Sequence, residues 1–289
     1  MSTISASSVK ELRDRTGQAM MDCKKALVET DGDLEKAIDQ LRKKGMAVLA
    51  KRADRESNEG KVIGKISDDG KSAVLVVLAC ETDFTAKNDE FVKVATQSAD
   101  AMLAADACDS VEALNELTSS TGQTVAADVN EIVSKTGEKI SLASANQYKL
   151  DGPGLIYCYV HFNGKIGTMI QLDADSDDVA SSEAMKSLAS DLAMHITAVS
   201  PEGVTRDSVD ADRIAREKDV ASEQVKNKPA NIIDKIVEGK MNKWFGQIVL
   251  LEQAFVKDDS KTITDVVAEA GKTAGGTITV KRFARVQIG

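Results

Sequence analysis

The sequence predicts an α+β protein with antiparallel sheets, whose core is a duplicated unit of β-hairpin and helix. An internal repeat is the main observation, because a shift of 94 positions places residues 60–78 on residues 154–172 with glycines and apolar runs in register. Each copy also holds an Asp-Gly or Asn-Gly dipeptide, at 69–70 and 163–164, and such dipeptides are the strongest short hairpin signals. Three short helical patterns precede the first copy and predict a separate N-terminal unit.

The composition is typical of a soluble folded protein, with 289 residues, 29% of them charged and 42% hydrophobic. This length has room for two or three compact units. The formal net charge of -9 argues against a protein that binds nucleic-acid phosphates, because such proteins need a basic surface. Aromatic residues, at 3%, are also too few for base-stacking platforms. We therefore expect no direct nucleic-acid ligand.

The sequence shows no sign of export or membrane insertion. Residues 1–15 meet charge at Lys10 and lack an apolar core, so they do not predict a signal peptide. No stretch approaches the roughly 20 apolar residues of a membrane helix. The cysteines form no Cys-x-x-Cys pair and fit reduced, buried thiols; they stand at positions 23, 80, 108 and 158. We expect a cytoplasmic protein without membrane contact.

The N-terminal unit is expected to contain three short helices. The first is expected to begin at Val9, the second to cover residues 19–29, and the third to start at Asp33 and to break at Gly45. A unit of about 45 residues is marginal as an independent fold, so a small adaptor is more plausible here than an active-site domain.

Met20 and Met21 are adjacent in the second of these helices. Methionines fill cores or form adaptable binding surfaces. Because neighbouring residues on a helix cannot both face inward, at least one of the two is expected to face outward.

Three units are expected along the chain. Residues 1–55 hold the N-terminal helices and a linker, since residues 46–59 are rich in alanine and charge and have almost no apolar stripe. Residues 56–150 and 151–289 hold the first and the second core subdomain. A helical hairpin at 208–246 is expected within the second subdomain.

Each predicted β-hairpin is followed by a helical pattern. The apolar run Ala73–Cys80 predicts a strand that is buried on both faces. The helices that follow the two hairpins are expected at 90–103 and 183–198. The remaining predicted elements are helices within 110–135, a strand at 139–150, a helix at 264–270, a glycine-rich stretch at 271–276 and a last strand at 277–286 that can join the core sheet.

Two opposed helices predict a hairpin that projects from the core. Residues 210–226 are highly charged, residues 227–229 turn the chain, and an apolar stripe lies between Ile232 and Phe245. This stripe must pack either against the first helix or against another copy of the chain. Self-association through the hairpin is therefore one of two alternatives.

Two motifs suggest ligand sites and fail on closer inspection. Residues 70–72 and 271–273 resemble the end of a phosphate-binding loop, but the required earlier glycines are replaced by Lys65 and Val266. The acidic stretch at 173–178 lacks the glycine and the final glutamate of a calcium loop and predicts a solvated turn. We expect the chain to bind neither nucleotide nor calcium by itself.

The segment that links the first buried strand to its helix is the main candidate for a functional site. Asp83 and Phe84 follow directly where the apolar run ends. The ring of Phe84 either tucks under the helix that follows or projects as an anchor for a partner.

His195 lies near the end of the second core helix, which Pro201 closes. The chain has two histidines, too few for a multi-histidine metal site. His195 is either a structural histidine near a helix C-terminus or, with Cys80, half of a nucleophilic pair. We expect no metal or other cofactor.

Four segments closely resemble the elongation factor Ts family of bacteria and occur in the same order. These segments are LRDRTGQAMMDCKKAL at 12–27, TDFTAKN at 82–88, AMHITAVSP at 193–201 and VEGKM at 237–241. The similarity covers essentially the whole chain, which makes it more specific than any single motif.

The resemblance implies a guanine nucleotide exchange factor that binds elongation factor Tu with GDP, displaces Mg²⁺ and promotes GDP release, without an enzymatic reaction of its own. It also implies that the N-terminal unit is a ubiquitin-associated-like (UBA-like) domain and that the helical hairpin is a coiled-coil module. The family's partner contacts fall on Arg13, Met20, Met21 and His195, and its Mg²⁺-displacing loop falls on Thr82, Asp83, Phe84 and Thr85.

Two rival classes of function have distinct consequences. A thiol enzyme would use Cys80 and His195 and would lose turnover in a Cys80→Ser variant. A scaffold that binds a peptide or a ubiquitin-like partner through the N-terminal unit would bind without changing nucleotide release.

Overall fold

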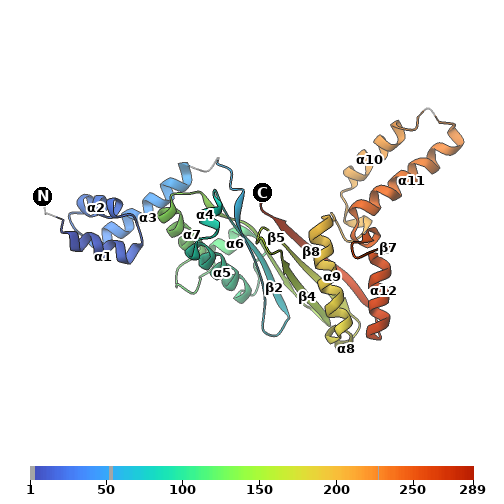
Figure 1. Ribbon diagram of the computed structural model, residues 1–289, viewed down its shortest axis with the longest axis horizontal. Helices are drawn as coiled ribbons and strands as arrows, with labels where there is room; N and C mark the ends of the chain where they lie inside the picture. Colours follow the sequence, from blue (N-terminus) through green and yellow to red (C-terminus); the bar gives the residue numbers. More distant parts are fainter. Residues whose placement is uncertain (1–3, 52–54, 227) are drawn as a thin grey trace.

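The computed structural model describes residues 4–51, 55–226 and 228–289. An N-terminal group of helices, a core with two sheets and a projecting helical hairpin follow one another along the long axis of the molecule (Figure 1). Residues 52–54 of the expected linker and Asn227 of the expected turn lie outside the described residues.

The N-terminal helices are α1 (Ala6–Thr16), α2 (Met20–Glu29) and α3 (Leu34–Lys51). Helix α1 begins earlier than expected, because the Ser5 hydroxyl accepts a hydrogen bond from the Ser8 amide and caps the helix. The expected break at Gly45 is wrong, since α3 continues to Lys51. A glycine inside a helix costs only about 1 kcal/mol, which a long helix tolerates. A small apolar core joins the three helices and consists of Val9, Leu12, Cys23, Ala26, Leu27, Ala37 and Leu41.

Two antiparallel sheets of three strands form the centre of the molecule. The first has the order β1 (Glu59–Ile66), β2 (Ser72–Cys80), β3 (Ile140–Lys149), and the second has the order β4 (Gly154–Val160), β5 (Ile166–Ala174), β8 (Ile278–Gln287). Both predicted hairpins are confirmed, and each gains a third strand. The register shifts between Val77 and Leu78 and again between Gln171 and Leu172, so the irregularity recurs at the 94-residue repeat.

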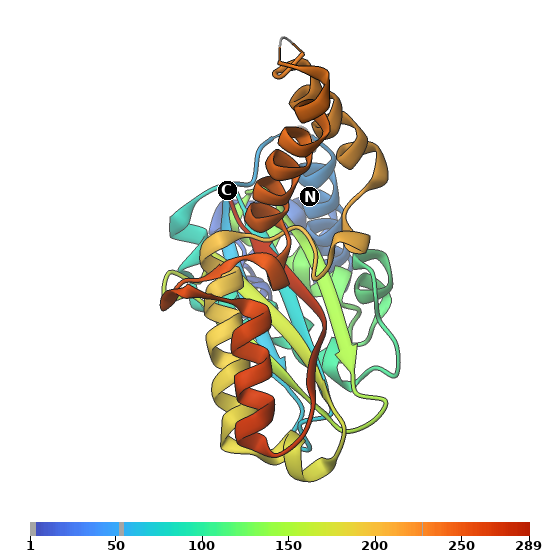
Figure 2. The ribbon, with the colours of Figure 1, turned by 90° about the vertical axis from the view of Figure 1, so that its right-hand side faces the viewer.

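The sheets pack face to face, and helices cover their outer faces (Figure 1). In β2, Ala73, Leu75 and Val77 point toward the second sheet, whereas the alternate side chains point toward the helices. The outer layer of the first sheet consists of α5 (Asp89–Ala104), α6 (Val111–Glu116) and α7 (Val125–Thr136). The outer layer of the second sheet includes α9 (Glu183–Val199) and α12 (Ile263–Ala274), which lie side by side in Figure 2.

Two helices and two small strands within residues 151–289 differ from the sequence-based expectation. Helix α12 continues through Gly271, where a side chain would meet the Gly276 carbonyl at 2.8 Å, and it ends at Gly275 in the left-handed region. The acidic segment at 173–178, expected as a solvated turn, includes the end of β5 and the start of α8 (Asp177–Ser181), which Ser176 caps. The small strands β6 (Ala254–Phe255) and β7 (Asp258–Thr262) have too little apolar pattern to be predicted.

The helical hairpin consists of α10 (Ala211–Glu223) and α11 (Ala230–Ile248) and extends beyond the core (Figure 2). Short 3-10 turns at Arg206–Ser208 and Leu250–Glu252 flank the two helices. The apolar stripe of α11 packs against α10 and the segments beside it within the same chain; the buried cluster consists of Val209, Ala221, Val225, Val237, Met241, Phe245 and Val249. None of the described helices is both long enough and apolar enough to cross a membrane.

Candidate functional site

A short helix, α4 (Asp83–Ala86), occupies the segment where a loop was expected. Thr82 makes this helix possible, because its hydroxyl caps it by accepting a hydrogen bond from the Thr85 amide at 3.4 Å. Glu138 in turn holds Thr82, accepting from its hydroxyl at 2.7 Å and from its amide at 3.1 Å. The helix is therefore fixed at the end of the buried strand β2.

The ring of Phe84 projects from α4, with 83% of the residue exposed. Its neighbours Thr85 and Ala86 are buried, so the inner side of the short helix is already occupied. Phe91 at the start of α5 is fully buried and fills the core below. Of the two alternatives for Phe84, the structure therefore shows the exposed ring.

Asp83 lies beside this ring and carries a negative charge. Its carboxylate accepts a hydrogen bond from the Lys87 ammonium group at 2.6 Å. This hydrogen bond, more than any other cause, lowers the pKa of Asp83. Because both side chains are largely exposed, the ion pair is readily exchanged for other partners.

Cys80 and His195 do not form the nucleophilic pair that one alternative required. The Cys80 thiol is buried and donates to the Thr82 carbonyl at 3.2 Å. Burial, and to a lesser extent the charge of Glu138, raises the pKa of Cys80 to about 12. A thiol that stays protonated is a poor nucleophile.

His195 is fully buried in the second subdomain. Its Nδ1 accepts from the Val256 amide at 3.3 Å, so Nε2 carries the proton and donates to the Gln253 side chain at 3.1 Å. Burial lowers the pKa of His195. The side chain does not reach the surface in this structure, and its role as a partner contact stays a prediction.

A shallow pocket of about 320 Å³ lies between α4 and the turn that joins β4 to β5. It is lined by Glu59, Gly60, Lys61, Asp83, Ala86, Lys87, Asn163 and Lys165. Phe162, which precedes Asn163 in that turn, is 93% exposed. Phe162 was not among the residues expected from the sequence to be functional; the signal that could have indicated it is a large aromatic residue directly before the predicted Asn-Gly turn.

The other predicted contact residues lie on the N-terminal helices. Met20 and Met21 are 52% and 73% exposed, so both face outward, which confirms the expectation that at least one of them does. Arg13 is exposed on α1. The structure brings Thr82 to Thr85 together on α4 and its N-cap. Arg13, Met20 and Met21 lie apart from them, on the N-terminal helices α1 and α2 at one end of the molecule (Figure 1).

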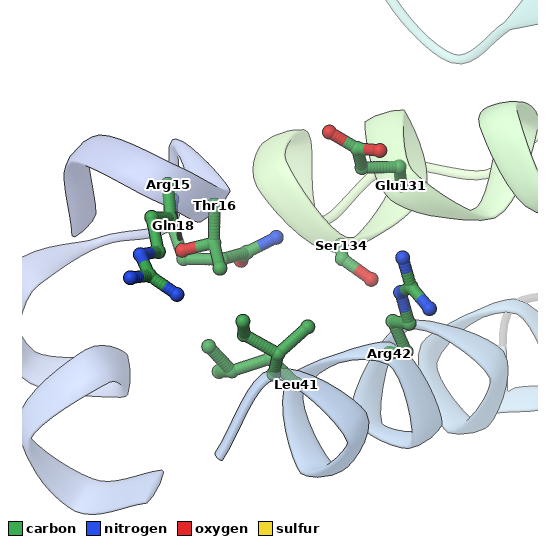
Figure 3. Close-up of a pocket in the computed structure, with 8 residues that line it drawn as sticks. Arg15, Thr16, Gln18, Leu41, Arg42, Glu131 and Ser134 are labelled. Atoms are coloured by element: carbon green, nitrogen blue, oxygen red, sulfur yellow. Dashed lines mark hydrogen bonds between the residues drawn. The ribbon is translucent and has the colours of Figure 1, made fainter. Parts of the chain in front are cut away.

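The N-terminal unit docks on helix α7 of the core. Figure 3 shows a pocket of about 160 Å³ at this junction, lined by Arg15, Thr16, Gln18, Ile38, Leu41, Arg42, Glu131 and Ser134. Arg42 donates to the Gln123 side chain at 3.2 Å. Gly17 lies so close to Lys135 that an added Cβ would come within 2.8 Å of its Cε atom. The unit is thus held by contacts with the core in addition to its chain connection.

In the part of the chain that the structure describes, no group of three or more histidine, cysteine, aspartate or glutamate residues is placed to hold a metal ion. The geometry offers instead an exposed aromatic side chain on a rigid base. Such a surface is suited to contact with another protein.

Comparison with known proteins shows to which family this sequence is similar. The family described as Elongation factor TS matches residues 81–289. Elongation factor Ts of Trichlorobacter lovleyi is 41% identical over 99% of this chain and 93% of its own length, and that of Nitratiruptor sp. is 42% identical over the same shares. Elongation factor Ts of Desulfovibrio desulfuricans is 41% identical over 100% of this chain and 99% of its own. The chain therefore belongs to the elongation factor Ts family.

Proposed function

We propose that this chain releases GDP from elongation factor Tu by inserting the ring of Phe84 into the GTPase and by disturbing its bound Mg²⁺. Membership of the family establishes the coarser part of this statement, a nucleotide exchange factor for elongation factor Tu in translation elongation. The proposed parts are the insertion of the Phe84 ring, called the wedge below, the displacement of Mg²⁺ and action in the cytoplasm.

The exposure of Phe84 is the observation that carries the proposal. An aromatic ring that projects from a fixed helix loses little conformational freedom when a partner covers it. Burial of one phenylalanine stabilises a complex by about 1.5 to 3 kcal/mol. If this contact forms only when GDP is bound weakly, it weakens GDP binding by roughly one to two factors of ten.

Asp83 supplies the proposed effect on the metal. Magnesium tolerates only near-octahedral coordination, so a carboxylate brought close to the ion disturbs its ligands and waters. The pKa of Asp83 is lowered by Lys87, so the carboxylate is charged at neutral pH. Its exposed ion pair with Lys87 can open when the partner approaches.

The N-terminal unit supplies the proposed grip on the GTPase. Arg13, Met20 and Met21 are exposed there, and methionine side chains adapt to a partner surface. We propose that this unit is a UBA-like domain and that the helical hairpin acts as a coiled-coil module. The apolar stripe of the hairpin is covered within the chain, which is the first of the two alternatives for it. Self-association through the hairpin stays a prediction.

Release of fluorescent GDP from purified elongation factor Tu, followed by stopped flow, tests the wedge. The wild-type protein should accelerate release, and Phe84→Ala should slow the accelerated rate by roughly tenfold or more. Ile66→Ala is a matched control, because Ile66 is an exposed apolar residue at the far end of β1 and should leave release unchanged. Equal rates for wild type and Phe84→Ala would contradict the proposal.

A further inference from the structure

Phe162 is a second exposed aromatic side chain on the face that carries α4. It lies in the turn between β4 and β5 and is 93% exposed. A single exposed hydrophobic residue is common and carries no function by itself. Phe162 differs from an ordinary exposed residue in two ways: its ring packs against His161, and it lies beside the proposed wedge.

The Phe162 ring rests on a fixed neighbour. It packs against the His161 imidazole with ring centroids 4.4 Å apart. The Tyr159 hydroxyl and His161 Nδ1 share a hydrogen bond of 3.0 Å. The turn itself is closed by the bond from the Gly164 amide to the His161 carbonyl at 2.8 Å. The backbone at Phe162 is therefore fixed, and its ring has one supporting contact before any partner arrives, which lowers the entropy cost of binding.

The turn is fastened to the same strand that supports α4. The Val62 amide of β1 donates to the Gly164 carbonyl at 2.9 Å, and Lys165 forms an ion pair of 2.6 Å with Glu59. Helix α4 also packs against β1. Phe84 and Phe162, one from each copy of the repeat, are thus both supported by strand β1.

The pocket of about 320 Å³ described above lies between α4, which carries Phe84, and the β4–β5 turn, which carries Phe162. On one side it is lined by Asp83, the residue before Phe84, and on the other by Asn163, the residue after Phe162. A partner that covers α4 therefore meets the β4–β5 turn as a continuation of the same surface.

We propose that Phe162 is a second aromatic anchor for the same GTPase. The GTPase contacts the rings of Phe84 and Phe162 and places a segment in the pocket between α4 and the β4–β5 turn. This inference rests on the proposed function, because the GTPase is chosen as the partner of Phe162 on the ground that the β4–β5 turn continues the surface of α4. Phe162 has no carboxylate neighbour in its turn and acts on affinity alone. A contact made equally in every nucleotide state changes half-saturation and leaves the maximal rate unchanged.

The test compares full-length variants at varied concentration in the GDP-release assay. Phe162→Ala should raise the half-saturating concentration by about tenfold to hundredfold and leave the maximal rate within twofold. Phe84→Ala should instead lower the maximal rate. Phe162→Tyr should restore half-saturation to near wild type, and Ile66→Ala should change neither quantity. Circular dichroism and melting temperature should be unchanged, because the ring is exposed.

The outcomes separate the two proposals. A half-saturation within twofold of wild type for Phe162→Ala, with slowed release for Phe84→Ala, would overturn the second anchor and leave the wedge standing. If the wild-type protein fails to accelerate release, the wedge fails, and calorimetric titration of nucleotide-free elongation factor Tu decides the anchor alone. In that titration, equal affinity of wild type and Phe162→Ala would overturn it, and a loss of tenfold or more would support it.

Discussion

At the scale of single residues, Thr82 determines how the candidate site is presented. Its hydroxyl caps α4 and also donates to Glu138, so one side chain ties the exposed Phe84 to the core. The sequence contained this information only in part. A threonine three residues before another polar residue is a weak cap signal, and the partner Glu138 is 56 residues away.

Replacement of Thr82 by valine should loosen α4 without unfolding the protein. Loss of an N-cap costs about 1 kcal/mol, so the ratio of molecules with α4 intact to molecules with α4 frayed should fall by roughly fivefold, and GDP release should slow by up to that factor. Thr262→Val is a matched control, because Thr262 caps α12 in the second copy. Stopped-flow release measures the effect; equal rates for the two variants would contradict it.

His195 should make the stability of the protein depend on pH. Burial lowers its pKa below the usual value of 6.5, so below that pH the unfolded chain binds a proton that the native state refuses. The contribution is therefore fully present above about pH 6.5 and is lost as the pH falls toward the lowered pKa. Urea unfolding between pH 8 and 5 should show a steeper loss for wild type than for His195→Gln. Parallel curves would refute this role of His195.

At the scale of elements, the strands were predictable and several helix ends were not. Asp-Gly and Asn-Gly turns fix the register of both β-hairpins locally, and the continuous apolar run of β2 marks a strand buried on both faces. Ser5 and Ser176 each accept from an amide three residues on, but other serines or aspartates stand near them, so the sequence does not indicate which of these residues caps the helix. Gly45 lies inside α3, although glycine is a common helix stop. The orientation of Phe84 depends on Phe91 filling the core, which only the packed structure reveals.

The N-terminal helices should act as a separable grip. They have their own apolar core, and the core sheets and helices have separate apolar clusters, so removing residues 1–52 should leave the core folded. Complex formation with elongation factor Tu should weaken by roughly tenfold or more, since the exposed methionines are lost. Calorimetric titration measures the affinity, and circular dichroism of the truncated protein controls for folding. Undiminished affinity would show that this unit is not a grip.

At the scale of the whole molecule, GDP and this chain must weaken each other's binding to elongation factor Tu by the same factor. If this chain weakens GDP binding by a given factor, GDP weakens binding of this chain by that factor. With one buried phenylalanine, the ratio should be at least roughly tenfold. Titrations of the partner with and without saturating GDP measure it. Identical affinity in the two titrations would exclude exchange by this route.

The face-to-face packing of the two sheets has a consequence for the origin of the chain. Each copy of the repeat covers its outer face with its own helices, while its inner face is covered by the other copy. A polypeptide with one copy alone would expose that apolar inner face to water, and its simplest remedy would be pairing with an identical molecule. The shared register shift at the same place in both copies fits such a history. In the single chain each half instead covers the inner face of the other, so the outer faces can differ, and one half bears the proposed wedge and the other the helical hairpin.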